Sequence, residues 1–213
     1  MTTYDPVEQE EALRAWWQRH GKNVLTGIAL ALAVILGVQW WLGQQQIKRE
    51  NAAILYTQMM DRLDKDAAQA QSLAGKLMEE YGDTPYAAFA ALAVARLEAE
   101  GGKLDEAAQR LHWALERADF LTGGADLVRL RLARVQLAQG QPDQALATLG
   151  QVQEAAFNGL AAALRGDIYV RQGQLDKART AYRTALADPA VGGQQRALLQ
   201  MKLDEIGAGE GAG

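Results

Sequence analysis

The sequence contains no cysteine, and this absence removes whole classes of chemistry. Without thiols there are no disulfides, no iron–sulfur clusters, no thiolate zinc sites and no cysteine nucleophile. Histidine is scarce as well, because only His20 and His112 occur and they lie far apart in the chain. Serine occurs once, at Ser72, and the sequence has no Walker pattern and no HExxH pattern. We therefore expect no catalytic residue, no metal site and no cofactor, and a protein that binds other molecules rather than an enzyme.

Charge and composition exclude two further classes. The 213 residues carry a formal net charge of −4, which argues against a general nucleic-acid-binding protein. Hydrophobic residues make up 49% and charged residues 23%, which is typical of folded proteins and excludes global disorder. The length suits one ordinary domain plus a short additional segment.

One long uncharged run departs from this average composition. Residues 23–47 are 25 consecutive positions without a charge. The apolar core of the run, Val24 to Leu42, has 19 residues. As a helix these would span about 28 Å, close to the hydrocarbon thickness of a bilayer. The run therefore predicts a transmembrane helix over 23–47. Tryptophan pairs at its two ends are typical of membrane interfaces: Trp16, Trp17, Trp40 and Trp41.

Two features favour an uncleaved signal anchor over a cleaved signal peptide. The apolar core is longer than a usual signal peptide core, and residues 40–43 lack the small-x-small cleavage pattern. Lysine and arginine near the ends favour a cytoplasmic N-terminus by three to two: Arg14, Arg19 and Lys22 against Lys48 and Arg49. We expect a single-pass membrane protein with residues 1–22 in the cytoplasm and a large domain on the other side; in a bacterium, that places residues 48–213 in the periplasm.

The cytoplasmic arm, residues 1–22, carries the signals of a short helix. Asp5 suits the N-cap and Pro6 the first helical position, while Gly21 suits a C-terminal stop. The arm is either an extension of the membrane helix or a segment that docks on a partner, and the sequence leaves both open.

Residues 48–206 carry a repeated helical pattern. Ala, Leu, Gln, Glu and Arg dominate, with apolar residues at three- and four-residue spacing. Three segments align on glycines at positions 102, 140 and 173, and each glycine is followed five residues later by an alanine. Their spacings of 38 and 33 residues resemble the tetratricopeptide repeat, whose period is about 34 residues. Each glycine is expected to form the turn between two antiparallel helices.

The third unit shows most clearly how such helices would pack. Small residues at Gly166, Ala178 and Ala185 allow close approach, and Tyr169 and Tyr182 are expected to fill the space beside them. The first two units are degenerate, because the position of Tyr169 holds glutamate at 98 and glutamine at 136.

The segments around the three units complete the domain. Residues 51–85 predict a fourth, divergent helical hairpin whose first helix continues from the membrane helix. Gln194 to Ile206 predicts a polar-faced capping helix, which a solenoid requires, and residues 207–213 predict a disordered Gly/Ala tail. The expected fold is all-α, with a single N-terminal transmembrane helix followed by a tetratricopeptide-like helical-repeat solenoid.

A protein-binding groove is expected on the concave face, which the first helix of each pair lines in such repeats. Apolar side chains with interspersed arginines suit a peptide or protein segment: Phe89, Leu92, Arg96, Leu127, Leu130, Arg134, Leu137, Leu160, Asp167, Val170 and Arg171. Arg96 and Arg134 share one offset from their glycines and are expected to be neighbours. About half of the leucines fit the core between helices equally well. Repeat proteins that clamp a C-terminal carboxylate use Lys and Asn at set groove positions. Here those positions hold other residues, so this clamp is not expected: Phe89, Ala93, Leu127 and Arg131.

The order of these parts resembles the YfgM family of bacterial inner-membrane proteins, which are ancillary to the SecYEG translocon. The resemblance rests on the run EALRAWW over 11–17, the polar RHGKN entry over 19–23, the Trp-Trp exit at 40–41, the TPYA turn over 84–87 and the repeats. It implies a periplasmic domain near the translocon exit that associates with SecYEG and the membrane-anchored chaperone PpiD, and that helps newly exported, unfolded proteins. It also implies a link to an envelope stress regulator. It implies no catalytic residue.

Two other functions stay open from the sequence. The repeat domain could be a scaffold for another envelope complex without binding unfolded chains. The protein could also be a stress-response regulator that acts through its cytoplasmic arm.

Overall fold

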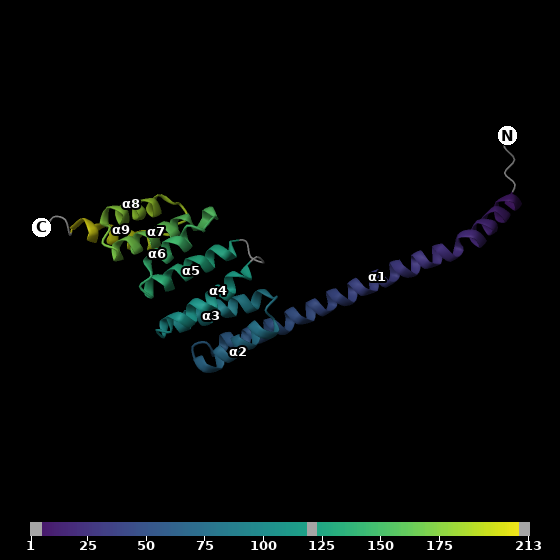
Figure 1. Cartoon of the computed structure of the whole chain (residues 1–213), viewed down its shortest axis with the longest axis horizontal. Helices are drawn as coiled ribbons and strands as arrows, with labels where there is room; N and C mark the ends of the chain where they lie inside the picture. Colours follow the sequence, from purple (N-terminus) through teal and green to yellow (C-terminus); the bar gives the residue numbers. More distant parts are fainter. Residues whose placement is uncertain (1–5, 119–122, 209–213) are drawn as a thin grey trace, which may run out of the picture. The chain divides into compact units, whose positions relative to one another are not determined.

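The computed structural model describes residues 6–118 and 123–208, and these residues are almost entirely helical (Figure 1). Within those two ranges there is no β-strand, so the expected all-α fold is confirmed. The elements in chain order are α1 (Pro6–Arg62), α2 (Ala67–Glu80), α3 (Pro85–Glu100), α4 (Leu104–Leu115), α5 (Gly124–Ala138), α6 (Pro142–Leu149), η2 (Ala155–Phe157), α7 (Asn158–Arg171), α8 (Leu175–Ala187) and α9 (Gly193–Ala208).

Helix α1 begins at Pro6, as predicted, and continues without interruption to Arg62. The predicted stop at Gly21 is therefore wrong, and the predicted N-cap, Asp5, lies outside the described residues. The indole of Trp17, one turn earlier, lies 3.3 Å from where a Cβ of Gly21 would stand. A lone glycine costs a helix only about 1 kcal/mol, which the long run of helix-forming residues after it offsets.

The apolar part of α1 exposes its side chains all round the helix. Leu25, Leu30, Val34 and Trp40 are 57, 63, 64 and 69% exposed, so no other described residue covers them. In the described part of the chain this is the one helix that is long and apolar enough to cross a membrane, with a mean hydropathy of 2.0 over its best window. Its side chains suit the hydrocarbon of a bilayer, which is as apolar as they are.

The chain divides into two compact units, Met1–Glu50 and Asn51–Gly213, and the second unit contains the repeats. Residues 51–62 of α1 share an apolar cluster with α2. The pairs α3–α4, α5–α6 and α7–α8 follow, with α9 at the end (Figure 1). Four apolar clusters lie in a row, each shared by three consecutive helices. The core is therefore continuous from one pair to the next, as in a solenoid.

The turn between the two helices of a repeat has the same geometry three times. Gly102, Gly140 and Gly173 have φ of 77°, 76° and 71°, the left-handed region that favours glycine. The residue after each glycine donates its N–H to the carbonyl five residues earlier, at 2.8, 2.9 and 2.8 Å. Each glycine also donates its own N–H to the carbonyl three residues earlier. These two hydrogen bonds form a Schellman motif, which ends the first helix of each pair, and the second helix then runs antiparallel to it.

Counting from these glycines locates the residues that meet inside each pair. Seven residues before the glycine, small residues are buried: Ala95, Ala133 and Gly166. Nine residues after it, large residues are buried: Leu111, Leu149 and Tyr182. In the third repeat the tyrosine ring lies so close to Gly166 that an added Cβ would overlap it. The third repeat therefore has a glycine–tyrosine pair at the position where the first two repeats have an alanine–leucine pair.

The two degenerate positions of the sequence are buried polar residues with partners on the second helix. Glu98 is 4% exposed, and Arg110 Nε lies 3.4 Å from its Oε1. Gln136 is 7% exposed, and Thr148 donates to its Oε1 at 2.8 Å. Each partner is 12 residues further along the chain, so these pairs join the helices where the third repeat has the half-buried Tyr169.

The capping helix α9 differs from the prediction in two ways. Leu199 and Ile206 are buried, but Leu198 and Met201 are 45 and 59% exposed, so its outer face is not wholly polar. The helix extends to Ala208, which places the first two residues of the predicted tail in α9. The remaining tail, 209–213, lies outside the described residues.

Asp126 is a buried carboxylate that joins α5 to the loop before η2. It accepts the backbone N–H groups of Gln153 and Glu154 at 2.9 and 2.7 Å, and Arg129 donates to it at 2.6 Å. Burial alone would raise the pKa of Asp126, but these hydrogen bonds and the Arg129 charge lower it below its ordinary value.

Asp126→Asn should destabilise the domain in a pH-dependent way. We expect the free energy of unfolding near pH 7 to fall by about 2 kcal/mol, since hydrogen bonds to a charged group contribute roughly 1.5–3 kcal/mol. The lowered pKa makes this contribution full above the unfolded value of about 4, and the contribution is lost as the pH falls through the folded pKa. Urea unfolding of the full chain in detergent at several pH values measures it. A difference that stays constant at every pH would contradict this account.

Gly166→Ala tests the close contact with Tyr182. The new methyl group must displace the ring, and such overpacking costs roughly 1–3 kcal/mol of unfolding free energy. The control is Gly75→Ala on α2, where a Cβ meets nothing within 4 Å. This control should stabilise the chain by about 0.5–1 kcal/mol, because alanine is the better helix former. Equal urea midpoints for the two variants would show that the ring does not need this space.

Candidate protein-binding groove

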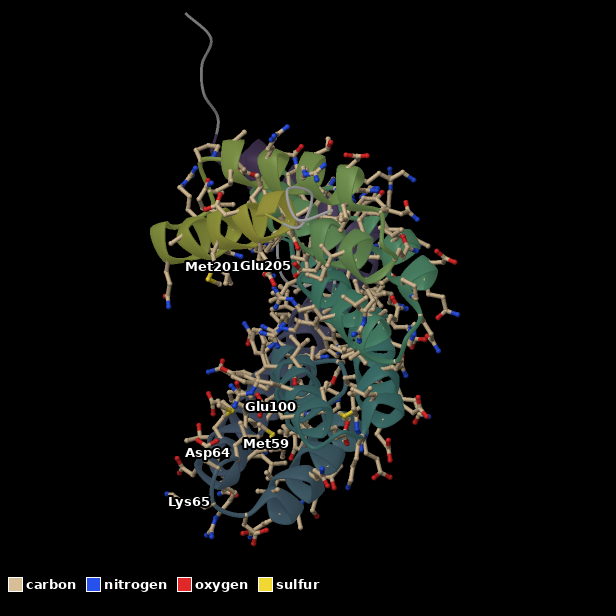
Figure 2. All side chains as sticks on the ribbon, turned by 90° about the vertical axis from the view of Figure 1, so that its left-hand side faces the viewer. Met59, Asp64, Lys65, Glu100, Met201 and Glu205 are labelled. Atoms are coloured by element: carbon tan, nitrogen blue, oxygen red, sulfur yellow. The ribbon has the colours of Figure 1, made fainter. Side chains whose placement is uncertain are left out.

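The residues six positions before the turn glycines are Arg96 on α3, Arg134 on α5 and Asp167 on α7, and the two arginines are exposed. In Figure 2, Glu100 on α3 and Glu205 on α9 lie along the same inner edge of the curved row of helices. Two pockets involve these residues: Arg96, which pairs with Glu100, lines the first, and Glu205 lines the second.

The first, called here the arginine pocket, lies between α3, α4 and α5 and has a volume of about 280 Å³. Its floor is apolar and its rim is basic. The lining residues are Leu92, Ala95, Arg96, Ala99, Leu111, Arg131, Arg134 and Val135. The structure thus brings the predicted neighbours Arg96 and Arg134 to one pocket, together with the predicted Leu92.

Arg131 is the third arginine of this pocket and was not among the predicted groove residues. It is half-buried, and its burial, followed by repulsion from Arg134 and Arg96, lowers the pKa of its guanidinium. The sequence carried a signal for it, because Arg131 and Arg134 are one helical turn apart and share a helix face.

The second pocket, called here the C-terminal pocket, has a volume of about 380 Å³. It lies between α7, α8 and α9 and is lined by Asp167, Val170, Leu175, Tyr182, Lys202, Glu205 and Ile206. The predicted Asp167 and Val170 meet here.

Asp167 is the centre of a small polar network in the C-terminal pocket. The Tyr182 hydroxyl and the Lys202 ammonium both donate to its Oδ1 at 2.6 Å. Burial, and then the bond to Asp167, raise the pKa of Tyr182 above its ordinary value. Lys202 belongs to α9, so this network holds the capping helix against the last repeat.

The other predicted groove residues line neither pocket. Leu130 is 2% exposed and belongs to the core between α5, α6 and α7. Phe89 packs beside Tyr56, with ring centroids 6.2 Å apart. The other three predicted leucines are half-buried: Leu127, Leu137 and Leu160. Arg171 is exposed at the end of α7.

The predicted interfacial tryptophans lie in the other unit, on α1. They are all exposed, by 48 to 69%: Trp16, Trp17, Trp40 and Trp41. The side chains of the described residues form no cluster of three or more groups that could hold a metal ion. The two pockets are lined by charged and apolar side chains.

Comparison with known proteins agrees with the repeat geometry. The family described as "Tetratricopeptide repeat-like domain" matches residues 14–208, so the fold and the match define a tetratricopeptide repeat-like protein. The solved structure of BtubC (BKLC) from P. vanneervenii shares this fold, with a TM-score of 0.56, 17% identity, and coverage of 76% of this chain and 72% of that one.

Similarity to curated proteins extends over nearly the full chain. Proteins named "Ancillary SecYEG translocon subunit" are 30% identical in Haemophilus influenzae (95% of this chain, 99% of that one) and 30% identical in Neisseria gonorrhoeae (93% and 97%). The one from Escherichia coli K12 is 27% identical (93% and 95%). The chain belongs to this family of ancillary SecYEG translocon subunits, as the resemblance to the YfgM family predicted.

Lys202→Gln tests whether the network in the C-terminal pocket holds α9. We expect the backbone amides of α9 to exchange with solvent about two- to fivefold faster, because an ion pair that is about one-third exposed contributes up to about 1 kcal/mol. Hydrogen exchange with mass spectrometry on the full chain measures this. The control Lys103→Gln changes an exposed lysine before α4. Unchanged exchange in α9 would mean that its apolar contacts alone hold it.

Proposed function

We propose that this protein is an ancillary subunit of the Sec translocon, anchored in the bacterial inner membrane by residues 23–47. Its N-terminal arm lies in the cytoplasm and its repeat domain in the periplasm. There the concave face binds segments of a chaperone, PpiD, or of newly exported proteins.

The observation that carries this proposal is the extent of the similarity. It covers 93–95% of the chain, which includes the apolar run as well as the repeats, and the relatives are named as translocon subunits. Repeats alone occur in proteins of many functions, whereas an alignment that also spans the membrane helix concerns the whole arrangement of the protein.

The geometry of the repeat domain supports a role in binding protein segments. The residues six before the turn glycines line two pockets that combine apolar and charged side chains. A membrane anchor keeps such a face near the translocon, where effective concentration makes even weak contacts productive. The function needs no chemical step.

Photo-crosslinking in intact cells tests the proposal. A photoreactive residue replaces Glu100, which is exposed and lies on the inner edge of the repeat unit. We expect crosslinks to translocon subunits, PpiD or exported chains, identified by mass spectrometry. The matched control is a probe at Thr184, which is exposed on α8; it should capture fewer of these partners.

The same experiment reports the orientation, because its partners belong to one side of the membrane. Capture of cytoplasmic proteins alone at Glu100 would contradict both the orientation and the function. Capture of envelope-assembly proteins alone would favour the scaffold instead. Loss of every partner on deletion of the arm would mean that the arm, and not the groove, is the working part.

A further inference from the structure

The arginine pocket concentrates positive charge that the described residues do not neutralise. Within the described ranges, Arg131 and Arg134 form no ion pair or hydrogen bond through their side chains. Arg96 Nε lies 3.5 Å from Glu100 Oε1, but the two side chains are 59 and 61% exposed. An ion pair this exposed is weak, so the pocket keeps most of its positive charge.

This charge is a local feature, since the whole chain carries a net charge of −4. Three arginines line this one pocket, and the pKa of half-buried Arg131 is lowered first by burial and then by repulsion from Arg134 and Arg96. Like charges held together cost stability in the free protein, and a bound anion relieves that cost. The pocket therefore has the electrostatic form of an anion site.

The floor of the pocket limits the kind of anion. It is lined by five apolar residues: Leu92, Ala95, Ala99, Leu111 and Val135. Its 280 Å³ is slightly below the roughly 300–1,000 Å³ of sites for small molecules and suits one apolar side chain. No aromatic residue is among those lining it, so it offers no stacking surface to a nucleobase.

Resting on the function proposed above, we propose that the arginine pocket binds an acidic–apolar segment of a partner protein. An internal Asp or Glu carboxylate lies between Arg96, Arg131 and Arg134, and an adjacent apolar side chain covers the floor. Guanidinium groups suit this role because each can donate two parallel hydrogen bonds to one carboxylate. A phospholipid carries two acyl chains, for which a floor of this size has no room.

The test measures binding of labelled peptides to the full chain in nanodiscs of zwitterionic lipid. The probe is a short peptide that alternates leucine and glutamate, with both ends blocked, and its binding is followed by fluorescence anisotropy. The matched peptides have glutamine or lysine in place of glutamate. We expect the glutamate peptide to bind about tenfold or more tightly than the glutamine peptide, and its binding to weaken as salt is added.

The variants locate the binding on the chain. Arg131→Gln should weaken binding of the glutamate peptide about tenfold, and addition of Arg134→Gln should remove the preference over glutamine. The control Arg183→Gln removes an exposed arginine of α8 that lines neither pocket, and it should bind like the unchanged chain. Far-UV circular dichroism of each variant verifies that the helices are intact.

Several results would overturn the inference. Equal binding of glutamate and glutamine peptides would show that charge plays no part. Binding only of a neutral peptide with a free C-terminus would assign the arginines to a terminal carboxylate. Binding to vesicles of anionic phosphatidylglycerol that depends on Arg131 and Arg134, without binding of the peptide, would assign them to a lipid headgroup.

Co-purification with SecYEG separates this inference from the function on which it rests. If Arg131→Gln retains SecYEG but the unchanged chain shows no preference for acidic peptides, the inference fails and the proposed function stands. If the unchanged chain binds acidic peptides but retains no SecYEG, the proposed function fails and the binding of acidic segments by the arginine pocket stands.

Discussion

The pairs α3–α4, α5–α6 and α7–α8 each reverse direction within a few residues, and each does so at a residue in the left-handed region that glycine adopts without strain. Gly102, Gly140 and Gly173 have nearly equal φ and the same hydrogen bonds. Because the turn is the same in these three pairs, positions counted from it meet in the same way in each of them. These positions determine which residues are buried between the two helices. In the third repeat the large Tyr182 is accommodated because the facing residue is Gly166.

The same turn also determines which side chains reach the concave face. Six residues before each glycine stand Arg96, Arg134 and Asp167, so the sign of charge changes between the second and third repeats. Arg131 adds a third positive charge beside Arg96 and Arg134. Asp167, in contrast, accepts hydrogen bonds from Tyr182 and Lys202. The two pockets therefore differ in kind: in one, Arg131 and Arg134 have no side-chain partner among the described residues, and in the other Asp167 bonds to Lys202 of the last helix.

The spacing of glycines and small residues was sufficient to predict the fold, the pairing of helices and the shared site of Arg96 and Arg134. It could not separate Leu92, which lines a pocket, from Leu130, which has the same offset but lies beneath α7. An offset gives the direction of a side chain from its helix axis and not how far the next helix covers it. The stop at Gly21 failed for a related reason, because a glycine ends a helix only where the chain turns away.

An acidic protein that presents a basic pocket selects partners at short range. At physiological salt, charges further apart than about 8 Å are largely screened, so a carboxylate is attracted mainly once it reaches Arg131 and its neighbours. The apolar floor then requires an adjacent apolar side chain, which restricts binding to segments that carry both. Such a contact is small and exchanges quickly. In the proposed function the protein is tethered beside a translocon, where high effective concentration would supply occupancy while weak individual contacts would let a passing chain go.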